Sequence, residues 1–116
     1  MATAQIQHIT IDCANPQRLA AFWSTVLGRE VVDDWGVFVR LAPDDAGTRL
    51  AFQLVPEAKS LKNRVHLDLS TDSVGAAVSE FKDLGATVVG TNSEAGITWT
   101  TMQDPEGNEF CVAPDH

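Results

Sequence analysis

The chain has 116 residues, of which 44% are hydrophobic, and this suits one small globular domain rather than several. Its 16 acidic and 8 basic residues give a net charge of −8, and the basic residues are scattered, so a nucleic-acid partner is excluded. No apolar run approaches the length that spans a membrane, and residues 1–4 lack the features of a leader, which predicts a cytoplasmic protein without membrane contact.

The first element pair is a strand followed by a clearly bounded helix. In residues 5–13 apolar and polar side chains alternate, which predicts a strand with His8 on its polar face. Asn15 suits the residue that caps a helix, apolar residues then recur at helical spacing over 16–27, and Gly28 suits a left-handed stop. The sequence therefore predicts a strand leading directly into an amphipathic helix.

The remaining elements follow in two similar series. Strands are expected at 29–33, 37–42 and 49–55, followed by a polar linker at 57–63. The pattern then returns as a strand at 64–70, a helix at 73–84, and strands at 86–91, 97–103 and 109–113. Turns rich in Gly, Asn, Asp and Pro are expected at 34–36, 43–47, 92–96 and 104–108. Each half therefore reads as strand, helix and three strands.

The two halves are separated by a nearly constant spacing. His8 and His66 are 58 residues apart, and the prolines that end the two halves are 58 apart as well. A repeat of this length indicates a duplicated supersecondary unit that buries its apolar face only beside its neighbour. We expect one domain, residues 1–116, built from two modules at about 5–56 and 63–114.

A four-stranded sheet with one helix has one face covered and one face open. By strand alternation, the face beneath the helices carries Ile9, Ile11, Phe52, Leu54, Val65, Leu67, Leu69, Phe110 and Val112. The open face carries His8, Thr10, Asp12, Ala51, Gln53, His66, Asp68, Ser70, Glu109 and Cys111. This polar face is either an ordinary solvated sheet surface or, if the two sheets curve together, the lining of a ligand cleft.

Four further residues are candidates for binding or chemistry. Trp35 lies in a turn where its indole would cap a ligand or a dimer partner, or simply remain exposed. The face that carries Trp99 is not fixed by the sequence, and Arg40 points either into the cleft as an anion donor or into solvent. Cys111 is either a small buried residue or a nucleophile that would need a histidine as its base.

Two motifs add a family resemblance to this pattern. The run N-P-x-x-L-A-x-F-W-x-x-x-L-G at 15–28 and the run D-P-E-G-N-E-F at 104–110, together with the duplication, resemble the vicinal oxygen chelate superfamily. More narrowly, the chain is similar to the small bacterial glyoxalase-like, bleomycin-resistance-like domains. The resemblance implies an α+β fold in which two tandem βαβββ modules form one open, barrel-like cleft, commonly completed by a homodimer.

The resemblance also implies a place for a metal. In metal-dependent members, histidine or glutamate side chains from the first and last strands of the modules hold one divalent ion. His8 and His66 match the first-strand positions, whereas Gln53 and Cys111 stand where glutamate is expected. No cofactor is certain: His8, Gln53 and His66 would hold zinc, nickel or iron with water, or the histidines are hydrogen-bonding residues of a pocket.

Two hypotheses of function remain from the sequence. The first is a metal-independent protein that binds a small organic molecule, with a binding set of His8, Thr10, Asp12, Trp35, Arg40, Gln53, His66, Trp99 and Cys111. The second is a metal-dependent lyase, isomerase or dioxygenase that acts on a substrate with adjacent oxygens, with Glu109 or Asp68 as the general base. The missing glutamates favour the first hypothesis, and the two aligned histidines favour the second.

Overall fold

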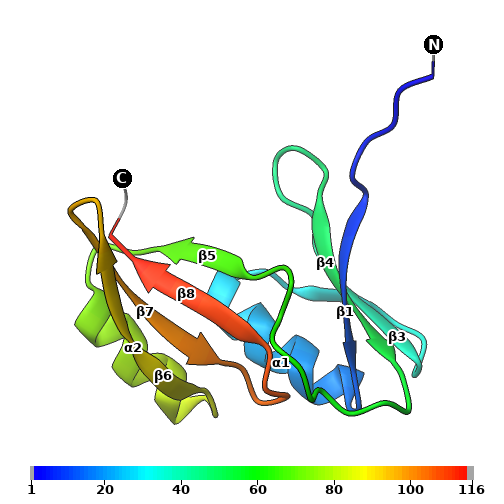
Figure 1. Cartoon of the computed structure of the whole chain (residues 1–116). Coiled ribbons are helices and arrows are strands. Elements are labelled where there is room, and N and C mark those ends of the chain that lie inside the picture. Colours follow the sequence, from blue (N-terminus) through cyan, green and yellow to red (C-terminus); the bar gives the residue numbers. More distant parts are fainter. Residues whose placement is uncertain (1, 115–116) are drawn as a thin grey trace. The chain divides into compact units, whose positions relative to one another are not determined.

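The computed structural model describes residues 2–114. The chain divides into two compact units, residues 1–58 and 59–116, and each unit contains one four-stranded sheet and one helix. Figure 1 shows the elements in chain order. Each unit has the order strand, helix and three strands, so the expected α+β fold with a duplicated βαβββ pattern is confirmed.

The elements of the first unit are β1 (His8–Cys13), α1 (Pro16–Leu27), β2 (Val31–Asp34), β3 (Phe38–Leu41) and β4 (Arg49–Leu54). The sheet has the order β1-β4-β3-β2, in which β1 runs parallel to β4 and the other neighbours are antiparallel. The first strand therefore pairs with the last strand of its own unit, which fixes the side chains of β1 and β4 on shared faces.

The elements of the second unit are β5 (Leu67–Ser70), α2 (Val74–Asp83), β6 (Thr87–Glu94), β7 (Ile97–Gln103) and β8 (Glu109–Ala113). The sheet order β5-β8-β7-β6 repeats that of the first unit, with β5 parallel to β8. Both halves of the sequence therefore build the same topology, as the repeat spacing predicts.

The helix ends follow the expected capping chemistry. The Asn15 side chain accepts a hydrogen bond from the Arg18 backbone N–H at 3.1 Å, and Pro16 occupies the first helical position of α1. Gly28 ends α1 with a φ of +65°, in the left-handed region that favours glycine. In the second unit, Ser73 caps α2 by accepting from the Ala76 N–H at 3.4 Å.

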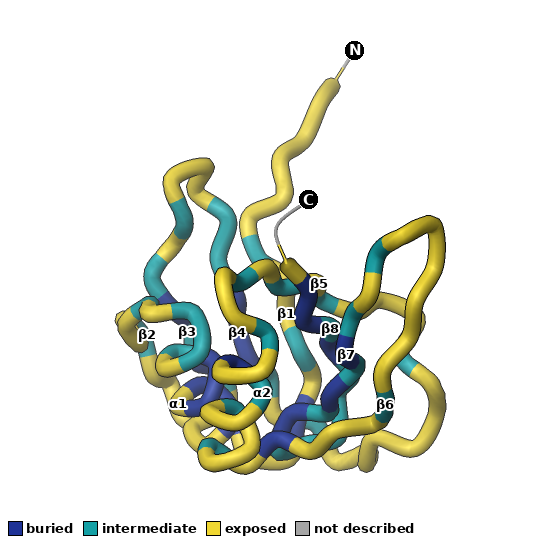
Figure 2. Tube along the Cα trace, turned by 90° about the vertical axis from the view of Figure 1, so that its left-hand side faces the viewer, coloured by how far each residue is buried: buried dark blue, intermediate teal, exposed yellow. Residues whose placement is uncertain are grey.

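Each unit has its core between the helix and one face of the sheet. In the first unit, Trp23 and Leu19 of α1 are fully buried together with Phe52 of β4, and Figure 2 shows buried stretches in both elements. In the second unit, Phe110 of β8 is fully buried, and its ring lies 6.2 Å from that of Phe81 in α2. In the first unit α1 packs on one face of the sheet, where it contacts β2, β3 and β4, and in the second unit α2 contacts β6 and β8. Among the described residues, the other face of each sheet is not covered by the helix of its own unit.

The second unit differs from its predicted outline at its first strand. The strand β5 begins at Leu67 rather than at residue 64, and Val65, expected beneath the helix, is 73% exposed. The physical reason is a side chain in the linker: Asn63 accepts a hydrogen bond from the Glu109 N–H at 3.2 Å and also donates to the Val65 carbonyl. These backbone groups are therefore not available for strand pairing.

The hairpin between β6 and β7 is also tighter than predicted. The strand β6 continues to Glu94, so the turn is the pair Ala95-Gly96 rather than the whole stretch 92–96. Both residues have positive φ values, +53° and +80°, which is the geometry of the two-residue turn that matches the twist of a hairpin. Asn92 and Ser93 therefore lie in the strand and not in a loop.

Within the described residues, no helix has both the length and the apolar character needed to cross a membrane.

Replacing glycine by alanine should have opposite effects on stability at Gly28, which ends α1, and at Gly75, which lies inside α2. Neither Gly28 nor Gly75 has an atom within 4 Å of an added Cβ, and only Gly28 has a positive φ. We expect Gly28→Ala to lower the free energy of unfolding by about 1 kcal/mol, because alanine is strained in the left-handed region. Gly75→Ala, the matched control inside α2, should raise it by about 0.5 kcal/mol. Chemical denaturation measures both, and a shift of the same sign in the two variants would contradict the helix boundaries.

Candidate functional site

The register of the second sheet decides which side chains share its open face. Asp68 pairs with Cys111, and Cys111 pairs with Thr101. Trp99 lies two residues before Thr101 in β7 and therefore points to the same side. The sequence left the face of Trp99 undecided, and this register places the indole with the polar residues rather than with the core.

The open face of the second sheet is hollowed. A concave space of about 820 Å³ lies against it, within the range of about 300–1,000 Å³ that small-molecule sites occupy. Its apolar lining includes Val89, Ile97 and Trp99. Its polar lining includes Lys62, His66, Asp68, Asn92, Glu94, Thr101, Glu109 and Cys111. The hollow therefore combines an apolar, aromatic area with several ionisable groups.

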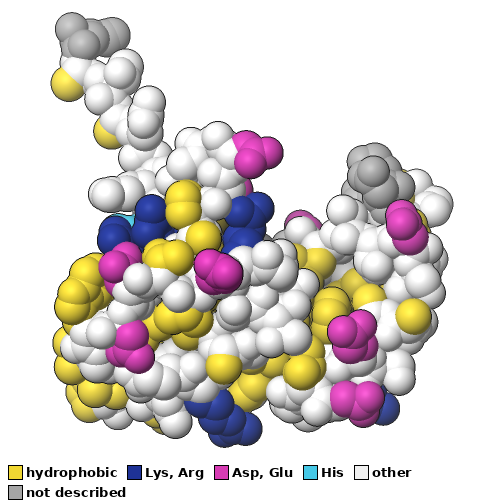
Figure 3. All heavy atoms as spheres, turned by 180° about the vertical axis from the view of Figure 1, so that it is seen from behind, with side chains coloured by type: hydrophobic (Ala, Val, Ile, Leu, Met, Phe, Trp, Pro, Cys, Tyr) yellow, Lys and Arg dark blue, Asp and Glu magenta, His cyan; other side chains and the backbone are white. Residues whose placement is uncertain are grey.

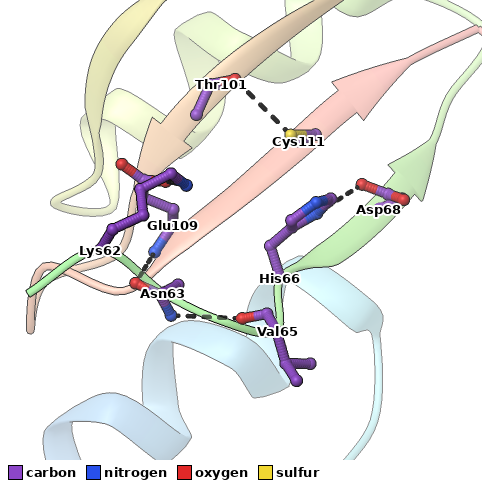
Figure 4. A network of polar contacts seen from close by, with 8 residues as sticks. All are labelled: Lys62, Asn63, Val65, His66, Asp68, Thr101, Glu109 and Cys111. Carbon is purple, nitrogen blue, oxygen red and sulfur yellow. Dashed lines mark hydrogen bonds and ion pairs between the residues drawn. The ribbon is translucent and has the colours of Figure 1, made fainter.

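The polar groups of the hollow are already in contact with one another (Figure 4). His66 Nδ1 lies 2.9 Å from Asp68 Oδ1, and the Thr101 hydroxyl lies 3.6 Å from Cys111 Sγ. The Lys62 ammonium forms an ion pair with Glu109 Oε1. The linker before β5 thus brings Lys62 to Glu109 of β8. His66, the residue just before β5, turns its ring toward Asp68.

Three of these residues offer different kinds of ligand atom at short range. One nitrogen of His66, one carboxylate oxygen of Asp68 and the sulfur of Cys111 all lie within 4.8 Å of one another. Cys111 carries a free thiol and is partly buried, whereas the other two side chains are exposed. Imidazole, carboxylate and thiolate together can ligate a divalent metal ion such as zinc.

The open face of the first sheet has a different chemistry. Arg40 Nε and Nη2 both donate to Asp33 Oδ2, at 2.9 Å and 2.6 Å, and Arg49 Nη1 lies 3.7 Å from the same oxygen. Arg40 Nη1 lies 3.3 Å from His8 Nε2, and because arginine cannot accept a hydrogen bond, this contact requires Nε2 to keep its lone pair. In Figure 3, basic side chains lie beside a histidine, and acidic side chains are dispersed over the rest of the visible face.

Aromatic rings extend this cluster. Trp35 is 58% exposed and stacks on Phe38, with ring centroids 6.0 Å apart and planes 16° from parallel. The Arg40 guanidinium lies 5.1 Å from the centroid of the Trp35 ring, within reach of a cation–π interaction. The indole that the sequence placed in a turn is therefore held by a neighbouring ring and a cation, although most of its surface stays accessible.

The remaining candidates of the first unit lie on β1 and β4. Thr10 pairs with Ala51 and Asp12 pairs with Gln53, so these side chains share the open face with His8 and Arg40. The Gln53 amide donates to the Val37 carbonyl at 3.1 Å and to the Leu54 carbonyl at 3.3 Å. The Gln53 amide group therefore donates its hydrogen bonds to backbone carbonyls of its own unit.

The structure groups the sequence candidates by unit. His66, Asp68, Trp99, Glu109 and Cys111 all line the hollow of the second unit. The sequence reasoning missed Thr101, Lys62 and Asp33 as members of these groups. Thr101 could have been predicted from the sequence, because it lies two residues after Trp99 in the same strand and so shares its face. Lys62 lies in a linker, where no periodic pattern predicts the direction of a side chain.

The comparisons with known proteins agree on one fold. Residues 8–113 match the family model described as a glyoxalase-like domain. The chain is similar to a glyoxalase/bleomycin resistance protein/dioxygenase family enzyme from Burkholderia phytofirmans PsJN, with a TM-score of 0.78, 19% identity, and coverage of 96% of this chain and 98% of that chain. A search of the curated proteins found no matching sequence.

Two further solved structures give the same picture. A glyoxalase-related enzyme from Fulvimarina pelagi has a TM-score of 0.78 at 17% identity, covering 97% of this chain and 89% of that chain. The oxidase ChaP-H2 has a TM-score of 0.71 at 19% identity, covering 99% of this chain and 96% of that chain. At such identities the likeness to solved structures concerns the fold alone, because one fold supports many activities.

The two ion pairs beside the open faces should differ in strength. Arg40 and Asp33 are 23% and 29% exposed and share two hydrogen bonds, whereas Lys62 is 71% exposed. In a double-mutant cycle of Asp33→Asn and Arg40→Met, we expect a coupling free energy of about 1 kcal/mol. The matched cycle of Lys62→Met and Glu109→Gln should give about 0.3 kcal/mol, since solvent screens the exposed Lys62 ammonium even though the Glu109 side chain is only 14% exposed. Equal couplings in the two cycles, measured by urea denaturation, would contradict this assignment.

Proposed function

Because this chain belongs to the glyoxalase-like domain family, we propose that it binds a small organic molecule in the hollow of its second unit. The observation that carries the proposal is the lining, in which Val89, Ile97 and Trp99 lie on the same open face as ionisable side chains. An apolar concavity with a few polar groups at defined places is the usual composition of a ligand site. We expect a flat, partly aromatic ligand with oxygen atoms at one end.

Each part of the lining would have its own role in recognition. The Trp99 indole offers a large rigid face on which an aromatic ring can stack. Lys62 and His66 supply N–H groups that can donate to ligand oxygens, and Asp68 or Glu109 would accept from ligand hydroxyls. The polar groups would orient the ligand, while burial of apolar area supplies most of the binding free energy.

The open face of the first unit carries the rest of the proposed binding set as a second surface, and none of its residues lines the hollow. Trp35 is exposed and lies beside the partly buried Arg40 guanidinium, and together they would suit a planar, anionic group. His8, Thr10, Asp12 and Gln53 accompany them on the same sheet face. The expected homodimer and cytoplasmic location are also part of this proposal, and both rest on the resemblance and the sequence alone.

A second candidate function is a metal-dependent lyase, isomerase or dioxygenase acting on adjacent oxygens. The observation that favours it is the approach of His66, Asp68 and Cys111 to within 4.8 Å. In such an enzyme Glu109 would act as the general base, or Asp68 would if the metal were held by the other side chains. Glu109 is in contact with the Lys62 ammonium, so proton abstraction by this carboxylate would require the ion pair to open.

The Trp99 side chain gives the direct test of small-molecule binding. We expect 2-naphthol, a flat aromatic alcohol, to shift the backbone amide signals of Thr101 and Cys111 in two-dimensional NMR spectra of the labelled protein. In Trp99→Ala the dissociation constant should rise about tenfold, because the stacking surface is lost. Trp35→Ala is the matched control, since it removes an exposed indole from the other unit.

Two results would contradict the proposal. One is a titration in which the shifts gather around Trp35 and leave Thr101 unchanged. The other is an unchanged dissociation constant in Trp99→Ala, provided that this variant retains the dispersed amide spectrum of a folded protein.

A further inference from the structure

We propose that His66, Asp68 and Cys111 form a metal site for zinc or a similarly soft divalent cation, complete within the second unit. This set needs neither His8 nor Gln53, the first-unit positions that the family resemblance implies. It is also independent of the organic ligand proposed above, because the three side chains would bind a metal ion with or without that ligand.

The strand register holds two of the three ligands together. Asp68 of β5 is the direct partner of Cys111 in β8, and parallel pairing puts both side chains on the open face. His66 stands two residues before Asp68 and turns its ring toward the same point, with Nδ1 2.9 Å from Asp68 Oδ1 (Figure 4). The register therefore fixes Asp68 beside Cys111, and the contact with Asp68 brings in His66 from the position just before β5.

The donor set and its spacing suit zinc. Zinc binds imidazole nitrogen, carboxylate oxygen and thiolate sulfur at about 2.0–2.3 Å, which places the ligand atoms of a tetrahedral site about 3.5 Å apart. His66 Nδ1 and Asp68 Oδ1 are already 2.9 Å apart, closer than this spacing, and all three ligand atoms lie within 4.8 Å, so a bound ion would require the side chains to adjust by about 1 Å. The side chains of His66 and Asp68 are 45% and 74% exposed and can make this shift without disturbing the core.

The surroundings support a cation at this point. Three carboxylates line the hollow, those of Asp68, Glu94 and Glu109, against the single ammonium of Lys62. Lys62 is itself in contact with Glu109, so its charge is balanced locally. The Thr101 hydroxyl, 3.6 Å from Cys111 Sγ, can donate to the thiolate and hold it in position, as residues behind metal ligands commonly do.

The first unit is less suited to the same ion. His8 Nε2 lies 3.3 Å from Arg40 Nη1, and its lone pair is directed at a permanently charged guanidinium. A divalent cation brought to this nitrogen would displace that contact and meet the charge of Arg40 directly. The difference in charge between the two open faces therefore favours the second unit.

Three protein ligands would leave one tetrahedral position open. His66, Asp68 and Cys111 all line the hollow, so that position would face the space in which we place the organic ligand. An open position filled by water or by a ligand oxygen is typical of zinc sites that bind substrates, whereas structural sites have four protein ligands. Through this position the metal would recognise an oxygen or sulfur atom of the ligand.

Cobalt(II) provides a spectroscopic test in the full chain. The protein, freed of any affinity tag and treated with a chelator, is titrated with Co²⁺ under reducing conditions. We expect one equivalent to produce the ultraviolet charge-transfer band of a thiolate–cobalt bond together with the intense visible bands of tetrahedral cobalt. Zinc should then displace the cobalt, because zinc binds the same donor set more tightly.

Variants assign the ligands and separate this site from one that uses the first unit. Cys111→Ser should abolish the charge-transfer band, while Cys13→Ser, which alters a buried cysteine beneath the helix, should keep it. His66→Ala and Asp68→Asn should each weaken cobalt binding at least tenfold. His8→Ala should leave both the band and the affinity unchanged. Circular dichroism verifies that each variant is folded.

Three outcomes would overturn the proposal. One is no cobalt binding to the folded protein, and another is cobalt binding without a thiolate band. The third is a loss of the band in His8→Ala, which would move the metal to a site that includes the first unit. The 2-naphthol titration uses the metal-free protein, so the two proposals can fail separately.

Discussion

The parallel pairing of the first and last strands within each unit is the constraint on which the rest of the structure depends. It joins β1 to β4 and β5 to β8, and the helix between the paired strands covers one face only. Alternate side chains must then lie on an open face. In the second unit this brings Asp68 level with Cys111, which the sequence separates by more than forty positions. Local helix and strand propensities alone would not produce that contact.

The same topology supports two different surfaces. In the first unit, Arg40 and Arg49 gather around Asp33, and Arg40 reaches both His8 and the Trp35 ring. In the second unit, a carboxylate, an imidazole and a thiol approach one another beside Trp99. The two units therefore share one sheet topology but differ on their open faces, with an arginine-rich surface in the first unit and a surface that suits a cation in the second. A fold of this kind carries chemistry through side-chain replacement at fixed positions.

Much of this arrangement was predictable because the periodic signals are strong. Alternation and capping residues gave the strand and helix series, including α1 from Pro16 to its stop at Gly28. One error came from a single side chain that competes with backbone pairing: Asn63 binds the Glu109 N–H and delays the start of β5, so Val65 is exposed. Predicting which sheet face carries Trp99 requires the strand order, and the periodicity of the sequence does not reveal that order. The shared cleft expected between the two modules remains a prediction.

The central claim is that strand register sets the composition of the second unit's open face, and nuclear Overhauser contacts across β5 and β8 test it most directly. The account predicts side-chain contacts between Asp68 and Cys111 and between His66 and Cys111. A slip of one residue would turn every side chain of β5 to the other face. Contacts that pair Cys111 with Leu67 or Leu69 in place of Asp68 would show that slip and contradict the account.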